Sequence, residues 1–219
     1  MSGGEGFLSV VPEKQVREVR AAMRRRNFSK GEVIFHDGDP GETLHLIEKG
    51  HVAIRRSTPL GDTVTFVILS AGDTFGELAL LRSHSYRAAT AIALEPTTTL
   101  SLGKAKLDEL RSHGPAVDRF LQAALAAQVE SLSARLLEAL YCTADKRILR
   151  RLADLADIYG PNATDTPIPI TQEDLASLAG TTRPTVNRLL KGLEGEGLLT
   201  LGRGSVTLHD LPTITRRGR

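Results

Sequence analysis

The chain has 219 residues, of which 41% are hydrophobic and 25% charged, so it can fold into one large or two small domains with cores of their own. The formal net charge of +2 excludes a uniformly basic surface, so any nucleic-acid-binding face must come from local clusters of Lys and Arg. Cys142 is the only cysteine, which excludes an intrachain disulfide framework and a four-cysteine metal site.

The N-terminal residues, Met1 to Gly6, lack the basic region and the apolar run of a signal peptide. No uncharged stretch approaches the roughly 20 residues that a membrane helix requires. We therefore expect a cytoplasmic protein that does not bind a membrane.

Residues 11–26 carry apolar residues at helix-like spacing before a run of three arginines: Val11, Val16, Val19 and Met23, then Arg24, Arg25 and Arg26. This pattern predicts a short amphipathic helix, because a basic last turn suits the negative end of the helix dipole. Contact of the arginine run with nucleic acid is the alternative.

From Phe28 to Leu102 the pattern changes to short β-prone runs, of which Val33–His36, Val52–Arg55 and Val64–Leu69 are the clearest. Glycines recur between the runs at intervals of about ten residues. These are Gly31, Gly38, Gly41, Gly50, Gly61 and Gly72. The spacing predicts an antiparallel β sandwich or barrel rather than βαβ units.

The stretch Phe75–Thr90 combines a turn glycine, a carboxylate, an apolar turn and, beyond a polar loop, an arginine followed by small residues. Gly76, Ala88 and Ala89 would let backbone N–H groups approach a phosphate closely. Arg87 offers a planar fork for phosphate oxygens, and the Glu77 carboxylate is a pure acceptor that suits a ribose hydroxyl. A surface ion pair between Glu77 and Arg87 is the alternative reading.

A long helix is predicted from Pro115 to about Cys142. Its apolar residues recur at heptad-like steps: Leu125, Val129, Leu132, Leu136 and Ala139. Such a stripe suits pairing with an identical helix and predicts a homodimer. The same stripe could instead pack on the chain's own β domain.

A further domain starts with a helix over residues 145–158, whose apolar residues lie on one face. Thr171 then has the pattern of an N-cap with acidic residues in the first turn of the next helix. Gly180 makes a turn, and Thr181 or Thr182 caps a third helix. This order predicts a helix-turn-helix. Pairs of helices with one apolar face also occur in proteins that bind no nucleic acid.

The third helix and the segment after it gather positive charge, because residues 181–192 contain three cations and no acid. A hairpin over Leu198–Leu208, with a glycine turn, would form a wing and place Arg203 near phosphate. The candidate DNA-binding residues are Thr182, Arg183, Thr185, Asn187, Arg188, Lys191 and Arg203. The basic run Arg216–Arg219 is expected to be a solvated end.

Phe-Gly-Glu-Leu-Ala-Leu, followed beyond a loop by Arg-Ala-Ala-Thr, resembles the phosphate-binding cassette of cyclic-nucleotide-binding domains. With the helix-turn-helix, the chain resembles bacterial transcription factors of the cyclic AMP receptor protein (CRP/FNR) family from about Phe28 to about Asp210. The resemblance implies an α+β fold. It would comprise an N-terminal antiparallel β-roll over 1–115, a dimerisation helix over 116–143 and a winged helix-turn-helix domain over 144–219.

The function implied by the resemblance is that of a homodimeric, sequence-specific DNA-binding transcriptional regulator, not an enzyme, under allosteric control by a cyclic nucleotide. The implied ligand contacts are Gly76, Glu77, Leu78, Arg87, Ala88, Leu132 and Ser133. The family's adenine-contacting Thr-Ser pair falls on Leu132 and Ser133, and a Leu side chain cannot hydrogen-bond a base. The phosphate and ribose anchors are present, and the base contact is weakened. Cyclic AMP is the expected effector, with cyclic GMP or a degenerate pocket that acts without ligand as alternatives. No cofactor and no metal are expected.

On the DNA side, Arg183 and Arg188 match the two arginines of the family's recognition helix, and Pro184 replaces a Glu between them. Each good bidentate arginine contact contributes roughly 1–3 kcal/mol of discrimination, and the missing Glu removes an acceptor for cytosine. We expect a near-palindromic double-stranded operator, different from the family's best-known one, with half-sites about 34 Å apart. RNA polymerase is an expected partner.

Two alternatives belong to other functional classes. A nucleotide hydrolase is disfavoured because the sequence shows no metal cluster, nucleophile–base pairing or Walker loop. A nucleotide-binding module that acts on a partner protein is disfavoured by the helix-turn-helix.

Overall fold

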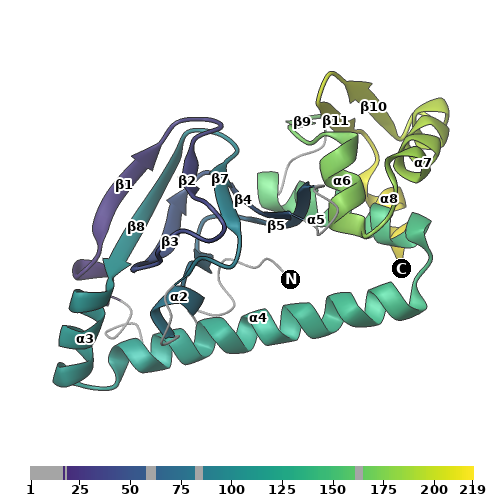
Figure 1. Ribbon diagram of the computed structural model, residues 1–219. Coiled ribbons are helices and arrows are strands. Elements are labelled where there is room, and N and C mark those ends of the chain that lie inside the picture. Colours follow the sequence, from purple (N-terminus) through teal and green to yellow (C-terminus); the bar gives the residue numbers. More distant parts are fainter. Residues whose placement is uncertain (1–16, 18, 58–62, 82–85, 161–164) are drawn as a thin grey trace. The chain divides into compact units, whose positions relative to one another are not determined.

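The computed structural model divides the chain into two compact units, an N-terminal unit, Met1–Ser131, and a C-terminal unit, Leu132–Arg219 (Figure 1). The structure describes residues 17, 19–57, 63–81, 86–160 and 165–219. Outside this part of the chain lie residues 11–16 of the predicted N-terminal helix, Gly61 and the loop within the Phe75–Thr90 stretch. Each unit is described by itself.

The N-terminal unit is built on two four-stranded sheets of antiparallel strands, which confirms the predicted antiparallel β fold. The sheet orders are β1-β8-β3-β6 and β2-β7-β4-β5. The strands are β1 (Arg24–Phe28), β2 (Val33–Phe35), β3 (Thr43–Lys49), β4 (Val52–Ser57), β5 (Thr63–Leu69), β6 (Thr74–Phe75), β7 (Thr90–Ala93) and β8 (Thr97–Gly103). Both sheets contribute to one buried cluster, formed by Ile47 and Phe75 of the first and Val52 and Ala91 of the second.

Helices close one side of this β structure through a second apolar cluster. They are α2 (Leu78–Leu81), α3 (Lys104–His113) and the first turns of α4 (Ala116–Tyr141). Leu80 of α2, Leu107 of α3 and Phe120 of α4 are buried against Leu44 and Leu102 of the sheet. The long helix is as predicted, whereas α3 was not expected. Within the described part of the chain, no helix combines the length and the apolar character needed to cross a bilayer.

The predicted helix over residues 11–26 is wrong at its end. Residues 19–21 are helical, but the three arginines lie in strand β1, which pairs with β8 at the edge of its sheet. Strand pairing with distant residues therefore decides their conformation, and the helix dipole plays no part. Their exposed charges at a sheet edge disfavour pairing with a further strand.

The C-terminal unit joins four helices to a three-stranded sheet of order β10-β11-β9, which confirms the predicted helix-turn-helix and hairpin. The helices are α5 (Ala144–Tyr159), α6 (Gln172–Ala179), α7 (Arg183–Gly195) and α8 (Leu211–Gly218). The strands are β9 (Pro167–Ile168), β10 (Leu199–Gly202) and β11 (Ser205–Leu208). Strand β9, which pairs with β11, lies between α5 and α6, where no strand was predicted.

The helix boundaries follow the predicted capping residues. The Thr171 hydroxyl accepts a hydrogen bond from the Asp174 N–H at the start of α6. Gly180 ends α6 in the left-handed conformation, with φ 59°, where the absence of a Cβ removes the steric penalty. Thr182 is the N-cap residue of α7, and Pro184 lies in its first turn.

The basic C-terminal run completes helix α8, which was not predicted, while its arginines, Arg216, Arg217 and Arg219, are exposed, as expected of a solvated end. Ile214 is fully buried, and Gly218 lies so close to α5 that an added Cβ would be 3.3 Å from the Leu149 Cβ. The Asp210 carboxylate caps α8 by accepting a hydrogen bond from the Thr213 N–H. The start signal, an Asp two residues before a Pro, was present in the sequence but was overlooked beside the arginines.

Candidate functional site

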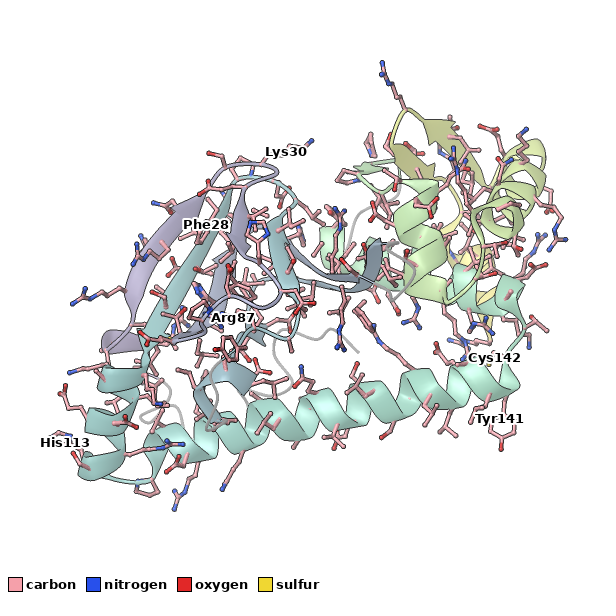
Figure 2. The ribbon with its side chains drawn as sticks, viewed as in Figure 1. Phe28, Lys30, Arg87, His113, Tyr141 and Cys142 are labelled. Atoms are coloured by element: carbon pink, nitrogen blue, oxygen red, sulfur yellow. The ribbon has the colours of Figure 1, made fainter. Side chains whose placement is uncertain are left out.

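The cassette residues Gly76, Glu77, Leu78, Arg87 and Ala88 lie within the N-terminal unit, between the end of β6 and the start of β7. Figure 2 labels Arg87. Gly76 has φ 83°, and a Cβ at this position would lie 2.5 Å from Nη1 of Arg87. Glycine is therefore required here both by the backbone angle and by the proximity of the guanidinium. Glu77 and Arg87 are 4% and 5% exposed, so the alternative of a surface ion pair is wrong.

The Arg87 guanidinium is held by three hydrogen bonds and one aromatic face. Nη1 donates to the backbone carbonyls of Thr43 (2.8 Å) and Gly76 (3.0 Å), and Nη2 donates to the Thr43 hydroxyl (2.7 Å). The group lies 4.0 Å from the centre of the Phe35 ring, in cation–π geometry. Burial lowers the pKa of Arg87, and the Glu77 and Asp39 carboxylates oppose the shift. Its Nε is buried without a hydrogen-bond partner among the described residues.

One oxygen of the Glu77 carboxyl group lacks a hydrogen-bond donor among the described residues, in the same way that Arg87 Nε lacks an acceptor. Burial raises its pKa, and its own backbone N–H, the Gln128 side-chain amide and Arg87 all act in the opposite direction. Its Oε2 atom is buried and, within the described part of the chain, accepts no hydrogen bond. Gln128 lies on α4, one helical turn before Leu132, and was missed because the family pattern directs attention to the later positions.

A layer of buried side chains beneath Arg87 was also missed. His45 of β3 is hydrogen-bonded through Nε2 to the Thr43 hydroxyl and through Nδ1 to the Thr99 hydroxyl, both at 3.1 Å. Its ring stacks on Phe75, with centroids 5.0 Å apart and planes 14° apart. Burial, Arg87 and Arg26 lower the pKa of His45 to about 4. Among the residues that the structure describes, no group of three His, Cys, Asp or Glu could hold a metal ion.

The other two predicted ligand residues, Leu132 and Ser133, lie on α4 in the C-terminal unit, and both are exposed. Leu132 belongs to an exposed apolar face of this helix. Its largest members are Val129, Leu132, Leu136, Leu137, Leu140 and Tyr141, each between 59% and 81% exposed. Leu125, at the start of the predicted stripe, is half-buried.

The predicted DNA-binding residues gather on α7 and on the turn of the β10–β11 hairpin. Arg183, Arg188 and Lys191 are exposed on α7, and Arg203 is exposed at the hairpin turn. Thr185 and Asn187 are half-buried on the same helix, and Thr182 is exposed at its N-terminus. Arg188 donates a hydrogen bond from Nη2 to Asp145 at 2.8 Å, so a carboxylate already occupies one edge of this guanidinium.

A groove of about 420 Å³ lies between the start of α6 and the hairpin, with Arg183 on its border. Its lining residues are Ile170, Thr171, Gln172, Glu173, Arg183, Leu201, Gly202, Gly204, Ser205 and Val206. The groove therefore lies next to two of the elements that carry the exposed cations.

Two family models match the chain. A cyclic nucleotide-binding domain covers residues 25–113, and a Crp-like helix-turn-helix domain covers residues 146–217. Together with the buried cassette and the cationic helix, these matches define a DNA-binding regulator with a cyclic-nucleotide-binding domain.

Similarity to known proteins identifies the family. A Cyclic AMP receptor protein of Thermus thermophilus is 33% identical over 211 residues, covering 96% of this chain and 94% of its own. The CRP-like cAMP-activated global transcriptional regulator of Mycobacterium tuberculosis is 26% identical over 217 residues, covering 98% and 96%. A solved CRP-family transcriptional regulator of Thermus thermophilus matches with a TM-score of 0.74 at 28% identity, covering 88% and 96%.

The chain thus belongs to the CRP/FNR family of transcriptional regulators. Its relatives are regulators rather than enzymes, which confirms that expectation and removes the nucleotide hydrolase from consideration.

The lowered pKa of His45 makes stability depend on pH. The unfolded chain takes up a proton near the ordinary His pKa of 6.5, whereas the folded protein does so only near pKa 4. The free energy of unfolding should therefore fall as the pH falls from 6.5 to 4, by roughly 3 kcal/mol at most. His45→Phe keeps a ring against Phe75 but lacks this contribution. We expect the stability deficit of the variant to narrow across this window in urea denaturation, and a constant deficit would contradict the assignment.

Proposed function

We propose that this regulator is a homodimer whose binding to a near-palindromic DNA site is controlled by a cyclic nucleotide, with cyclic AMP as the first candidate. The observation that carries the proposal is the pair of buried atoms in the cassette, Nε of Arg87 and Oε2 of Glu77. One is a charged donor and the other an acceptor, and neither has a partner among the described residues. Buried polar groups of this kind are rarely left unsatisfied in folded proteins.

A cyclic nucleotide would satisfy both atoms at once. Its phosphate would accept from the fork of Arg87, and its ribose 2′-OH would donate to Glu77. The backbone at Gly76, Leu78 and Ala88 would approach the phosphate and sugar, since Gly76 and Ala88 leave little side-chain bulk there. We expect Glu77 to bind as the carboxylate, because a protonated acid would lose acceptor capacity.

The identity of the base is supported by the relatives rather than by the cassette. The curated relatives of Thermus and Mycobacterium are described as a cyclic AMP receptor protein and a cAMP-activated regulator. Ser133 would supply a hydroxyl to the base, whereas Leu132 offers only an apolar contact. The second candidate, a regulator that acts without nucleotide, is favoured by this one substitution.

Control of DNA binding would be a shift in population between two arrangements of the protein. A ligand can bias such an equilibrium only by its differential affinity for the two states, with a typical coupling of about 1–3 kcal/mol. Contacts from both the cassette and α4 would give the nucleotide that differential affinity. Gln128 of α4 already helps to lower the pKa of Glu77, and Leu80 of α2 packs in one cluster with Phe120 of α4.

The effector is identified by calorimetric titration of the protein with cyclic AMP and cyclic GMP. We expect micromolar or tighter binding of cyclic AMP, weakened about 100-fold or more by Arg87→Ala, because two charge-assisted hydrogen bonds are lost. Arg56→Ala, at an exposed arginine of β4, is the matched control and should bind as the wild type does. Thermal unfolding checks that each variant is folded. The absence of heat with either nucleotide, while specific DNA is still bound, would establish the ligand-independent alternative.

The exposed apolar face of α4 supports dimerisation. Leu132 and Leu136 are each 60% exposed, although both are heptad positions of a long helix. The alternative, packing of the whole stripe on the chain's own β domain, would require these leucines to be buried within one chain. An identical helix would cover them and would be continuous with the half-buried Leu125.

Leu136→Glu should weaken self-association by about 3–5 kcal/mol, because both copies of the leucine lose their burial and two carboxylates approach each other. Ala134→Glu introduces the same charge at an exposed position of α4 outside the stripe and should leave the assembly unchanged. Sedimentation equilibrium over a range of concentrations measures the dissociation constant. A wild-type protein that remains monomeric at micromolar concentration would contradict the dimer.

DNA recognition is assigned to α7 and the hairpin. Arg183 and Arg188 would read base edges in the major groove, and Lys191 and Arg203 would contact phosphates. Arg188 would exchange its bond to Asp145 for a bond to DNA. RNA polymerase is the proposed partner at the promoter.

Arg183→Ala should weaken binding of the selected operator by about 1–3 kcal/mol and relax preference at one base of each half-site. Arg203→Ala should weaken all sequences alike and lower the salt dependence by about one ion per subunit. Arg119→Ala, at an exposed residue of α4 in the N-terminal unit, is the control. Fluorescence anisotropy with operator and scrambled duplexes, at several salt concentrations, distinguishes the two effects. Equal loss on both duplexes for Arg183→Ala would contradict a base contact.

A further inference from the structure

The side chains beneath Arg87 form one continuous chain of hydrogen bonds that no cassette motif includes. It runs from the guanidinium Nη2 to the Thr43 hydroxyl (2.7 Å), on to His45 Nε2 (3.1 Å), and from His45 Nδ1 to the Thr99 hydroxyl (3.1 Å). Thr99 and His45 are 0% and 6% exposed, so the bond between them is buried, and the two bonds of Thr43 are partly buried. The chain links the phosphate arginine to strands β3 and β8.

Only some of the N–H groups of Arg87 donate hydrogen bonds to the described residues of the protein. A guanidinium has five N–H groups, and three hydrogen bonds occupy Nη1 and part of Nη2. Because Nη1 and Nη2 both donate to Thr43, the end of the group is occupied. Within the described part of the chain, the Nε–H and the second Nη2–H have no acceptor, and together they form the parallel fork that matches two phosphate oxygens. Thr43 therefore holds one edge of Arg87, and on the other edge the buried Nε has no hydrogen-bond partner among the described residues.

The charge of Arg87 also favours one direction for the chain of hydrogen bonds. Arg87 can only donate, so the Thr43 oxygen accepts, and its polarised O–H becomes a better donor to His45 Nε2. His45 is then the neutral Nδ1–H tautomer, which donates to Thr99. The opposite tautomer would point an N–H toward the guanidinium charge, the same charge that helps to lower the pKa of His45. Each donor thus points away from Arg87.

We infer that Thr43 and His45 are positioning residues that fix the guanidinium of Arg87 in the orientation in which its Nε edge receives the phosphate. This inference rests on the proposed binding of a cyclic nucleotide. Thr43 holds the guanidinium directly, and His45 acts through Thr43, while its stacking on Phe75 keeps the imidazole in place. Neither side chain touches the nucleotide. Their contribution is preorganisation, since a freely rotating arginine would have to be immobilised on binding.

The test compares nucleotide affinity with stability in matched variants. Thr43→Val and His45→Phe each remove the hydrogen-bonding atoms while keeping shape or ring stacking, and each should weaken cyclic AMP binding about 3- to 10-fold in calorimetry. Thr43→Ser retains the hydroxyl and should restore most of the affinity. Thr98→Val removes a threonine hydroxyl that is bonded to Asn27, outside this chain of hydrogen bonds, and should bind as the wild type does.

The double variant, Thr43→Val with His45→Phe, distinguishes positioning from general destabilisation. If both residues act through the same chain of hydrogen bonds, the affinity of the double variant for cyclic AMP should be about that of the single variant with the lower affinity. Two results would overturn the inference. One is a loss of binding free energy in the double variant that equals the sum of the two single losses. The other is a loss of affinity that parallels the loss of unfolding free energy measured by urea denaturation. Unchanged affinity in both single variants would also overturn it, and the proposed function would stand. If the wild type binds no cyclic nucleotide, the proposed function fails and the inference fails with it.

A spectroscopic measurement tests the chain of hydrogen bonds without ligand. Nitrogen-15 NMR of the imidazole, assigned by comparison with His45→Phe, should show Nδ1 protonated and Nε2 unprotonated at neutral pH. Thr43→Val should lower the population of this tautomer, because Nε2 loses its donor. The opposite tautomer in the wild type, or no change in the variant, would overturn the coupling between Arg87 and His45.

Discussion

The structure of the N-terminal unit depends on the burial of one charge that cannot be neutralised, the guanidinium of Arg87. A buried cation without partners is strongly unfavourable, so the fold must bring acceptors to it. Thr43 and Gly76 supply backbone oxygens from two segments that are paired as β3 and β6, and Phe35 supplies a ring face from the other sheet. The two sheets and the cassette turn are thus tied to the same group. The protein satisfies this charge only in part, because the buried Nε has no hydrogen-bond partner among the described residues.

In the C-terminal unit, another arginine side chain, that of Arg147, also holds backbone carbonyls of separate segments. Arg147 donates to the carbonyls of Cys142 (2.7 Å), Ala179 (2.8 Å) and Gly180 (2.9 Å). Carbonyls at helix ends have no partner within their own helix, and this one side chain satisfies those at the end of α4 and at the turn between α6 and α7. The turn that sets the angle between α6 and the recognition helix is therefore fixed to the first residues after α4. A change in the end of α4 has a direct structural route to the DNA-binding motif.

The parts of the fold that could be predicted from the sequence are those determined by local chemistry. The caps at Thr171 and Thr182, the left-handed Gly180 and the glycine turn of the hairpin each depend on a few consecutive residues. The conformation of Arg24–Arg26 could not be predicted, because it is decided by pairing with β8. In the candidate site, the cassette motif identified Glu77 and Arg87, but not the residues that hold them. Thr43 is 44 positions from Arg87, and Thr99 is 54 from His45, so no local pattern connects them.

Gly41 shows how far the influence of the buried arginine reaches. A Cβ at this position would collide with the side chain of Ala79 in α2 and lie 3.1 Å from Cδ and Nε of Arg87. The position has no functional group and lies outside the motif by which the site is recognised. Even a single methyl group there would displace either α2 or the arginine. Natural variation at this position would therefore move Arg87 while leaving the cassette motif unchanged, and an intact motif would not by itself identify a working sensor.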